Sequence, residues 1–274
     1  MSQPAVSRAL SRLRSIFDDP LFVKGAGGVI ATPRAMSLQL PMASLLSELR
    51  TVIGGTTFDP TTCTRVFRIA TTDYGALAVF APAIDYLMDL APNIGLEILP
   101  LADEAFAGLG TGNIDLALYS DDPIALELSS MALFEERYVT LMRAGHAAAG
   151  ALQTGRLTLE QFLAYGHILV TIGGDRTGEV DTALAALGKS RWIALSLPYF
   201  ATAAVMASKT DLLLTIPERV AANFAAGLAL EVVKPPVQVE GFGYRLLWHK
   251  RSDSDPGNRW LRESLRYLTA GIEA

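Results

Sequence analysis

A chain of 274 residues, half of them hydrophobic and 19% charged, is long enough to bury a large core and to form one to three structural units. The formal net charge of −5 excludes a global positive field that would hold the chain on a polyanion, so any contact with nucleic acid has to be local. Of the 23 basic and 28 acidic residues, residues 1–60 hold six and four, which makes the front mildly positive and the remainder acidic.

The single cysteine, Cys63, excludes an intramolecular disulfide and a metal site built from several cysteines. The first residues lack the basic and then apolar layout of a secretory signal, and every apolar stretch is interrupted before it reaches membrane-spanning length. We therefore expect a cytoplasmic chain with no membrane partner and no cofactor.

The opening stretch SQPAVSRALSRLR, residues 2–14, predicts an amphipathic helix with Ser2 as its N-cap and Pro4 in its first turn. One side of this helix carries the apolar residues Val6, Ala9, Leu10, Leu13, Ile16 and Phe17. The other side is small, polar and cationic, as a face that enters a DNA major groove has to be. A solvated face of an ordinary N-terminal helix has the same composition, and this alternative stays open.

The next stretch, DDPLFVKGAGGVIATPRA, predicts two short strands over 21–23 and 29–31 that are joined by a glycine-rich tip containing Gly25, Gly27 and Gly28. Thr32 and Pro33 are typical of the N-cap and first residue of a new helix. The order is therefore helix, two-stranded wing, helix.

Three motifs in this order, SQPAVSRALSRLR, DPLFVKG and TPRA, resemble the recognition helix, wing and linker-helix start of the LysR-type transcriptional regulators. The resemblance implies a partial winged helix-turn-helix DNA-binding domain over residues 1–31 and a linker or dimerisation helix over 32–60. It implies promoter DNA as a partner. The residues expected to contact that DNA are Gln3, Pro4, Ser7, Arg8, Arg12 and Lys24.

The family pattern has a further stretch before the recognition helix that this sequence lacks. A core without its first helices leaves Val6, Leu10, Leu13 and Phe17 unburied, at a cost of roughly 1.5–3 kcal/mol for each large side chain. We expect a start codon placed too late, or a fragment, and we expect the chain as given to bind duplex DNA poorly.

A coiled-coil seam follows, with apolar residues spaced alternately by four and three at Leu38, Met42, Leu45, Leu49 and Val52. The seam predicts a homodimer or homotetramer, and Pro41 is expected to kink the helix or shift the seam. A helix packed on its own domain is the alternative over so short a span.

From Arg65 onward, short β-branched runs alternate with helical stretches, which predicts an α/β fold of parallel sheets with helices on both faces. The final strand, YRLLWHKR, and the helix opened by Asp255 and Pro256 are expected to return to the first half and so make two lobes with a double hinge. Residues 61–274 resemble the LysR effector-binding domain, a two-lobed type 2 periplasmic-binding-protein-like fold.

Ligands of such sheets settle at the carboxyl ends of the strands, near helix N-termini. Hydroxyl groups there suit an anionic head, and two aromatic rings suit a flat apolar body. The expected ligand-binding residues, which come from strand ends in both halves, are Thr71, Thr72, Asp73, Pro100, Leu101, Thr171, Gly173, Tyr199 and Phe200. An ordinary helix cap at residues 71–73 and a core position for Phe200 are equally compatible with the pattern.

No catalytic constellation is present, because His146, His167 and His249 lack metal-ligand spacing and no G-x-S-x-G elbow exists. We expect a DNA-binding transcription regulator controlled by a small-molecule effector. DPLFVKG and WHKRSDSDPGNRWLR resemble the branch of regulators that respond to aromatic compounds and flavonoids, so the effector is expected to be aromatic. The hydroxyls at residues 71–73 also suit a carboxylate. A solute-binding module without DNA function is the alternative, and an enzyme on a binding-protein fold is a more distant third.

Overall fold

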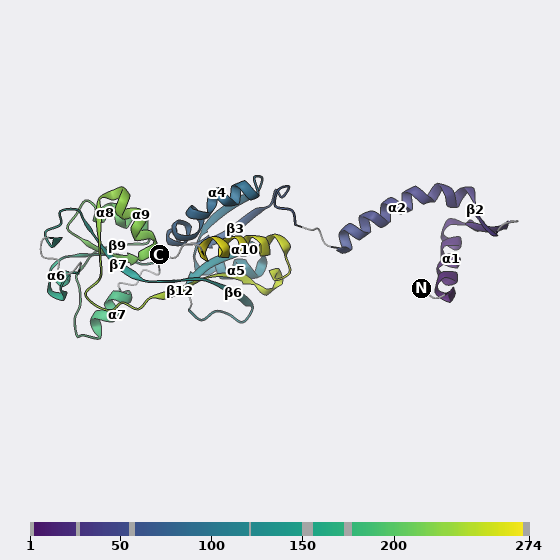
Figure 1. Cartoon of the computed structure of the whole chain (residues 1–274). Helices are drawn as coiled ribbons and strands as arrows, with labels where there is room; N and C mark the ends of the chain where they lie inside the picture. The colour runs from purple at the N-terminus through teal and green to yellow at the C-terminus, as the bar shows by residue number, and fades with distance from the viewer. Residues whose placement is uncertain are drawn as a thin grey trace. The chain divides into compact units, whose positions relative to one another are not determined.

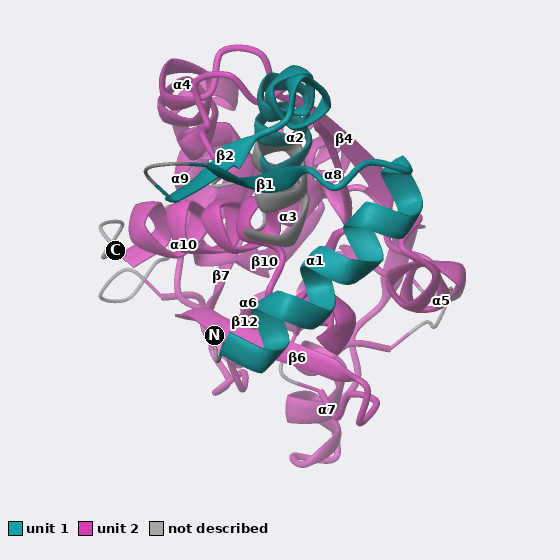
Figure 2. Ribbon diagram, turned by 90° about the vertical axis from the view of Figure 1, so that its right-hand side faces the viewer, with its two compact units in different colours: residues 1–57 teal, residues 58–274 magenta. Residues whose placement is uncertain are grey.

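The computed structural model describes residues 3–25, 28–54, 58–120, 122–149, 156–172 and 177–270, without the side chains of Asp103 and residues 47–54. These residues form two compact units, residues 1–57 and 58–274, which are coloured separately in Figure 2. Three residues singled out in the sequence, Ser2, Gly27 and Gly173, lie outside the described residues.

The first unit has the predicted order of helix, hairpin and helix. Helix α1 (Gln3–Phe17) precedes the antiparallel strands β1 (Phe22–Gly25) and β2 (Gly28–Ala31), and α2 (Pro33–Gly54) follows them.

Thr32 starts α2 as the sequence predicts, because its Oγ1 accepts a hydrogen bond from the Ala35 amide at 3.1 Å. The same hydroxyl donates to Asp19 Oδ1 at 2.7 Å, which ties the turn after α1 to the start of α2. Pro41 lies inside α2. Of the predicted seam, Leu45 is half exposed, and the side chains of Leu49 and Val52 lie outside the described residues.

The second unit contains two five-stranded mixed sheets, and Figure 1 shows the helices that flank them. The sheet of the first lobe has the order β4-β3-β5-β12-β6. Its strands are β3 (Val66–Thr71), β4 (Gly95–Pro100), β5 (Leu116–Ser120), β6 (Leu128–Glu136) and β12 (Phe242–His249). Strand β3 runs parallel to β4 and β5, whereas β12 runs antiparallel to β5 and β6.

The sheet of the second lobe has the order β11-β7-β10-β8-β9. Its strands are β7 (Tyr138–Arg143), β8 (His167–Val170), β9 (Ile193–Leu197), β10 (Leu213–Pro217) and β11 (Leu230–Val233). Strand β8 is parallel to β9 and β10, and β7 is antiparallel to β10 and β11.

Helical segments follow most strands in both lobes. Those of the first lobe are α3 (Asp73–Gly75), the π-helical η1 (Ala76–Phe80), α4 (Ala81–Leu90), α5 (Asp103–Thr111), the 3-10 segment η3 (Lys250–Ser252) and α10 (Pro256–Ala270). Those of the second lobe are α6 (Leu159–Ala164), α7 (Glu179–Ala185), α8 (Phe200–Ala207) and α9 (Glu218–Leu228). Helix α10 packs against α4 and β6, so the end of the chain returns to the first lobe as predicted.

The sequence-based expectation of parallel sheets is only partly met, because both sheets are mixed. Strands β6, β7 and β11, which the sequence pattern did not reveal, bring antiparallel pairing into both sheets, and β12 is antiparallel as well. The α/β class and the two-lobed architecture are confirmed.

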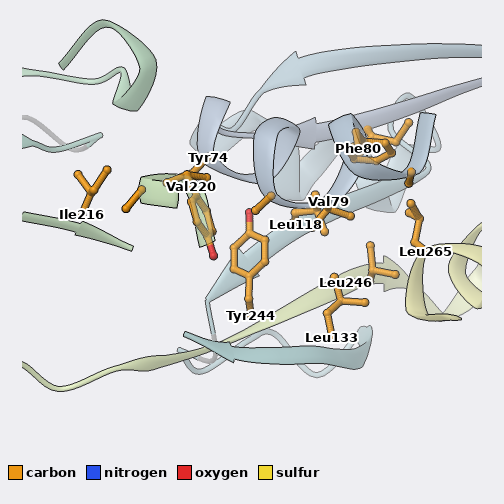
Figure 3. Packing of buried hydrophobic residues seen from close by; sticks show 14 of the residues in the cluster. Tyr74, Val79, Phe80, Leu118, Leu133, Ile216, Val220, Tyr244, Leu246 and Leu265 are labelled. Atoms are coloured by element: carbon orange, nitrogen blue, oxygen red, sulfur yellow. The ribbon is translucent and has the colours of Figure 1, made fainter. Parts of the chain in front are cut away.

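One hydrophobic core extends across both lobes. Leu118, Leu133 and Leu246 come from the first sheet, and Ile216 and the α9 residue Val220 approach from the second lobe (Figure 3). Within the described residues, no helix combines the length and apolar character needed to cross a membrane. Those residues also hold no group of three or more metal-ligating side chains.

Candidate functional site

A cavity of about 470 Å³ lies between the two lobes of the second unit. The first lobe supplies the residues that follow β3 and β4 together with parts of β5 and β12, and the second lobe supplies the starts of β7, α7 and α8 and the end of β10. The lining residues are Thr72, Tyr74, Leu101, Leu118, Tyr119, Ser120, Asp122, Tyr138, Ile172, Glu179, Phe200, Pro217, Glu240, Gly241, Phe242 and Tyr244. This volume is in the range of small-molecule sites.

Parallel strand ends place the first group of lining residues. Strand β3 ends at Thr71, and Thr72 then adopts an extended conformation and caps α3, with its Oγ1 accepting from the Gly75 amide at 3.4 Å. Leu101 follows β4, which is parallel to β3, so both residues emerge at the same edge of the sheet.

Aromatic rings surround Tyr74 at the cavity. The Tyr74 ring meets Tyr244 edge-on at 5.1 Å between centroids, and its centroid lies 5.7 Å from Phe200 of the second lobe and 6.0 Å from Phe242. Figure 3 shows Tyr74 and Tyr244 beside each other, where the two lobes meet. Such ring pairs are rigid and suit a flat apolar ligand.

The Tyr74 hydroxyl is held by a buried carboxylate. It donates to Glu136 Oε2 at 2.5 Å, and Glu136 Oε1 accepts from the Arg137 amide at 2.9 Å. Burial, followed by the charge of Glu136 and this hydrogen bond, raises the pKa of Tyr74 far above its usual value. The phenol therefore stays protonated at neutral pH.

Two crossings connect the lobes beside the cavity. One runs from Glu136 at the end of β6 to Tyr138 at the start of β7, and the other runs through residues 234–241 from β11 to β12. Gly241 lies so close to the first crossing that a Cβ atom there would lie 2.1 Å from the Glu136 carbonyl oxygen. Only glycine allows this approach of the two backbones.

Three of the residues predicted to bind a ligand line the cavity: Thr72, Leu101 and Phe200. Thr71 and Asp73 lie next to it and serve the fold. The buried Thr71 has its hydroxyl 3.3 Å from that of Tyr244, and Asp73 Oδ2 accepts from the Ala201 amide at 3.1 Å. Asp73 therefore joins the first lobe to the N-terminus of α8 in the second.

Three other residues predicted to bind a ligand lie outside the lining of this cavity. Pro100 lines a separate hollow against α5, because β4 lies at the edge of its sheet. The Thr171 amide donates to the Leu197 carbonyl and extends the β8–β9 pairing, while its neighbour Ile172 reaches the cavity. Tyr199 is 57% exposed and outside the lining.

Sequence reasoning missed most of the aromatic lining, including Tyr119, Tyr138, Phe242 and Tyr244. These residues lie on or beside strands that cross between the lobes or pair antiparallel. Phe242 and Tyr244 are two residues apart in a strand and so share a face, which is the one signal that could have indicated them.

The candidate DNA-contacting face lies on the first unit. All six residues predicted to contact DNA are exposed, five on α1 and Lys24 on β1. Arg14, on the same polar side of α1, is used differently, because its Nε donates to the Pro20 carbonyl at 2.7 Å. Arg14 thus fastens the wing to α1. Within the part of the chain that the structure describes, Arg8 bonds inside its own helix, from Nε to the Pro4 carbonyl at 3.3 Å.

The apolar side of α1 is largely unburied in the described structure. Ile16 is 70% exposed and Val6 49%, and α1 has no buried residue. Leu13 and Phe17 line an apolar hollow of about 330 Å³ together with residues of β1 and α2.

Two α/β lobes with a double crossing and a cavity between them define a ligand-binding domain of the two-lobed binding-protein class. The profile of the LysR substrate binding domain matches residues 64–270. The chain is 34% identical over 265 residues to the HTH-type transcriptional activator NahR of Pseudomonas putida, covering 96% of this chain and 87% of that protein.

Two further comparisons agree. The HTH-type transcriptional regulator SyrM of Rhizobium etli is 35% identical over 266 residues, which cover 96% of this chain and 77% of SyrM. The crystal structure of a probable transcriptional regulator from Pseudomonas aeruginosa is 31% identical, with a TM-score of 0.69 over 98% of this chain and 88% of the other. The chain belongs to the LysR family of transcriptional regulators, and the resemblance found in its sequence is confirmed.

Proposed function

We propose that this LysR-family protein is a sequence-specific DNA-binding regulator controlled by a small aromatic effector that binds in the cavity between its lobes. The observation that carries the proposal is the cavity itself, with its aromatic walls supplied by both lobes and its crossings at Glu136 and Gly241. The protein acts by binding, not by catalysis, and we place it in the cytoplasm as a homo-oligomer joined through α2.

The proposed mechanism is a population shift. A ligand that touches Phe200 of the second lobe and Thr72 of the first favours one lobe arrangement to the extent that its affinity for the two arrangements differs. The hydrogen bond from the Ala201 amide to Asp73 spans the lobes and is a contact that such a shift would change. The readout is a change in the DNA contacts of linked subunits.

The proposed DNA contacts are the exposed residues Gln3, Pro4, Ser7, Arg8 and Arg12 of α1, with Lys24 on the wing. Short side chains allow close approach to a groove, and arginine suits guanine or phosphate. The overall charge of −5 requires that binding depend on this local face.

The DNA part of the proposal is tested by enriching duplexes from a random pool with the chain extended by the stretch that the family pattern places before the recognition helix, called the full-length protein below. We expect one enriched sequence class, and we expect Arg8→Ala to weaken binding to it by about 1–3 kcal/mol if Arg8 reads a base. The matched control is Lys209→Ala, which removes a cation outside the first unit. A wild-type protein that enriches no sequence but still binds an effector would instead support a solute-binding module without DNA function.

A further inference from the structure

The charge of the cavity lining carries information about the effector. Asp122, Glu179 and Glu240 contribute three carboxylates, and all three residues are exposed at the cavity. Among the described lining residues there is no lysine, arginine or histidine. The charged side chains among the described lining residues are therefore all negative.

None of these three carboxylates forms an ion pair within the described residues. Asp122 accepts a hydrogen bond from Ser120 Oγ, and Glu179 and Glu240 form no ion pair there. Arg245 lies close by, where its guanidinium donates to the main-chain carbonyls of Ser120 and Asp122 and offsets part of the charge of Asp122. The negative charge of the lining therefore comes mainly from Glu179 and Glu240. Glu179 is the first residue of α7, where the helix stabilises its negative charge without removing it.

The protein also occupies the two helix starts at which an anionic ligand would otherwise be held. Thr72 Oγ1 accepts from the Gly75 amide at the start of α3, and Asp73 Oδ2 accepts from the Ala201 amide at the start of α8. Both sets of donors are therefore partly satisfied, and at α8 the satisfying group is itself a carboxylate. The sequence pattern predicts that the threonines at residues 71 and 72 bind an anionic group of the ligand. Because these helix starts are already occupied, the structure does not favour an anionic ligand there.

The aromatic lining completes the argument. Six aromatic residues line the cavity: Tyr74, Tyr119, Tyr138, Phe200, Phe242 and Tyr244. The negative faces of such rings attract organic cations, and carboxylates nearby add to that attraction. The negative charge of the lining also acts on Tyr138. Burial raises the pKa of Tyr138, and the charges of Glu179 and Glu136 raise it further.

We propose that the cavity selects an aromatic effector carrying a protonated amino group over one carrying a carboxylate. This inference rests on the proposed function, because it assumes that the cavity is the effector site. Three probes that share a 4-hydroxyphenyl ring and differ in charge distinguish the charge preference from the role of the cavity as the effector site. Tyramine is a cation, tyrosol is neutral and 4-hydroxyphenylacetate is an anion.

Calorimetric titration of the full chain with each probe is the test. We expect tyramine to bind at least tenfold more tightly than 4-hydroxyphenylacetate, with tyrosol between them. Glu179→Gln and Glu240→Gln should each weaken tyramine binding by about three- to tenfold and leave tyrosol binding nearly unchanged. Glu160→Gln, which removes an exposed carboxylate on α6 outside the lining, is the matched control and should change neither.

The outcomes distinguish the inference from the function on which it rests. Binding of 4-hydroxyphenylacetate as tightly as tyramine overturns the charge preference, while tyrosol binding that Phe200→Ala weakens still supports the cavity as the effector site. Failure of all three probes to bind contradicts both proposals.

Discussion

Thr72 serves both the fold and the candidate site, which makes its substitution informative. Its hydroxyl caps α3 and also lines the cavity. We expect Thr72→Val to lower the free energy of unfolding by about 1 kcal/mol through loss of the cap and to weaken effector binding, whereas Thr72→Ser retains both. Denaturant unfolding and titration of the two variants measure the two effects; equal behaviour of Val and Ser would contradict a role for the hydroxyl.

Substitution of Phe200 distinguishes an effect on packing from an effect on ligand binding more clearly than substitution of Thr72. Its half-buried ring contacts Tyr74 across the lobes, so Phe200→Ala should cost about 1–2 kcal/mol of stability, less than the roughly 3–5 kcal/mol of a fully buried phenylalanine. Because the ring also walls the cavity, effector affinity should fall at least tenfold. A full structural loss with unchanged affinity, measured by unfolding and titration, would assign Phe200 to the core alone.

His167 predicts a dependence of stability on pH. Burial lowers its pKa to about 4 in the folded chain, and its Nε2 lies 2.8 Å from the Phe162 carbonyl. The imidazole takes up a proton near pH 6.5 in the unfolded chain but not in the folded chain, so protonation favours unfolding below that pH. The contribution of neutral His167 to the free energy of unfolding is therefore complete above pH 6.5 and is lost as the pH falls toward 4. We expect about 2 kcal/mol of lost stability between pH 7 and pH 5.

Urea unfolding at these two pH values, with His167→Gln as the comparison, checks this prediction. The variant should lose less stability than the wild type over the same interval, because the buried imidazole is gone. An identical loss in both proteins would show that other groups cause the acid sensitivity.

Residue positions could be predicted from the sequence where a parallel strand runs directly into a helix. Thr72, Leu101 and Phe200 satisfied that rule and line the cavity. Tyr138 and Tyr244 did not, because each lies in a strand that connects the lobes and pairs antiparallel. Their position depends on long-range pairing, which no local pattern of residues contains.

Helix α2 carries a proline in its interior, so replacing this proline should stabilise the helix. Pro41 has no amide hydrogen to donate, whereas Pro33 occupies the first helical position, where that hydrogen would have no partner. Pro41→Ala should raise the free energy of unfolding of the first unit by up to about 3 kcal/mol. Thermal unfolding followed by circular dichroism, with Pro33→Ala as the control, checks it; equal effects would contradict the prediction.

Because the two crossings between the lobes approach closely at Gly241, we expect that adding a single methyl group there destabilises the protein. Gly241→Ala places a Cβ against the Glu136 carbonyl, so the crossings must separate at a cost of about 1–3 kcal/mol, and effector affinity should fall with the changed cavity. Gly227→Ala is the matched control, since a Cβ there meets nothing within 4 Å and helix propensity favours alanine. Equal stability of both variants, measured by urea unfolding, would contradict this account of the crossings.

The elements missed by sequence reasoning have a physical explanation. Residues 128–143 form two strands around Glu135, Glu136 and Arg137, a charged group that normally indicates a loop. Glu136 is instead buried and satisfied by Tyr74 and by the Arg137 amide. That compensation exists only after the lobes have formed, so the local sequence did not reveal these two strands.

At the scale of the whole molecule, the acidic balance of the chain and the mildly basic start fit a division of tasks between its two units. The first unit presents an exposed cationic helix face, and the second encloses a cavity with acidic and aromatic walls. The family and the two-lobed architecture could both be predicted from sequence, because the motifs at the start and the alternation of strands and helices are local. The charge of the cavity could not, because its three carboxylates are 57 to 118 residues apart in sequence.

The most direct test of the central claim is the effector dependence of DNA binding. The affinity of the full-length protein for a duplex enriched from a random pool is measured by fluorescence anisotropy, without and with a saturating concentration of the probe that binds most tightly. We predict a change of at least about fivefold, as expected for coupling of 1 kcal/mol or more, and its loss in Phe200→Ala. An affinity for DNA that is the same with and without the bound probe would contradict the claim that the cavity controls this regulator.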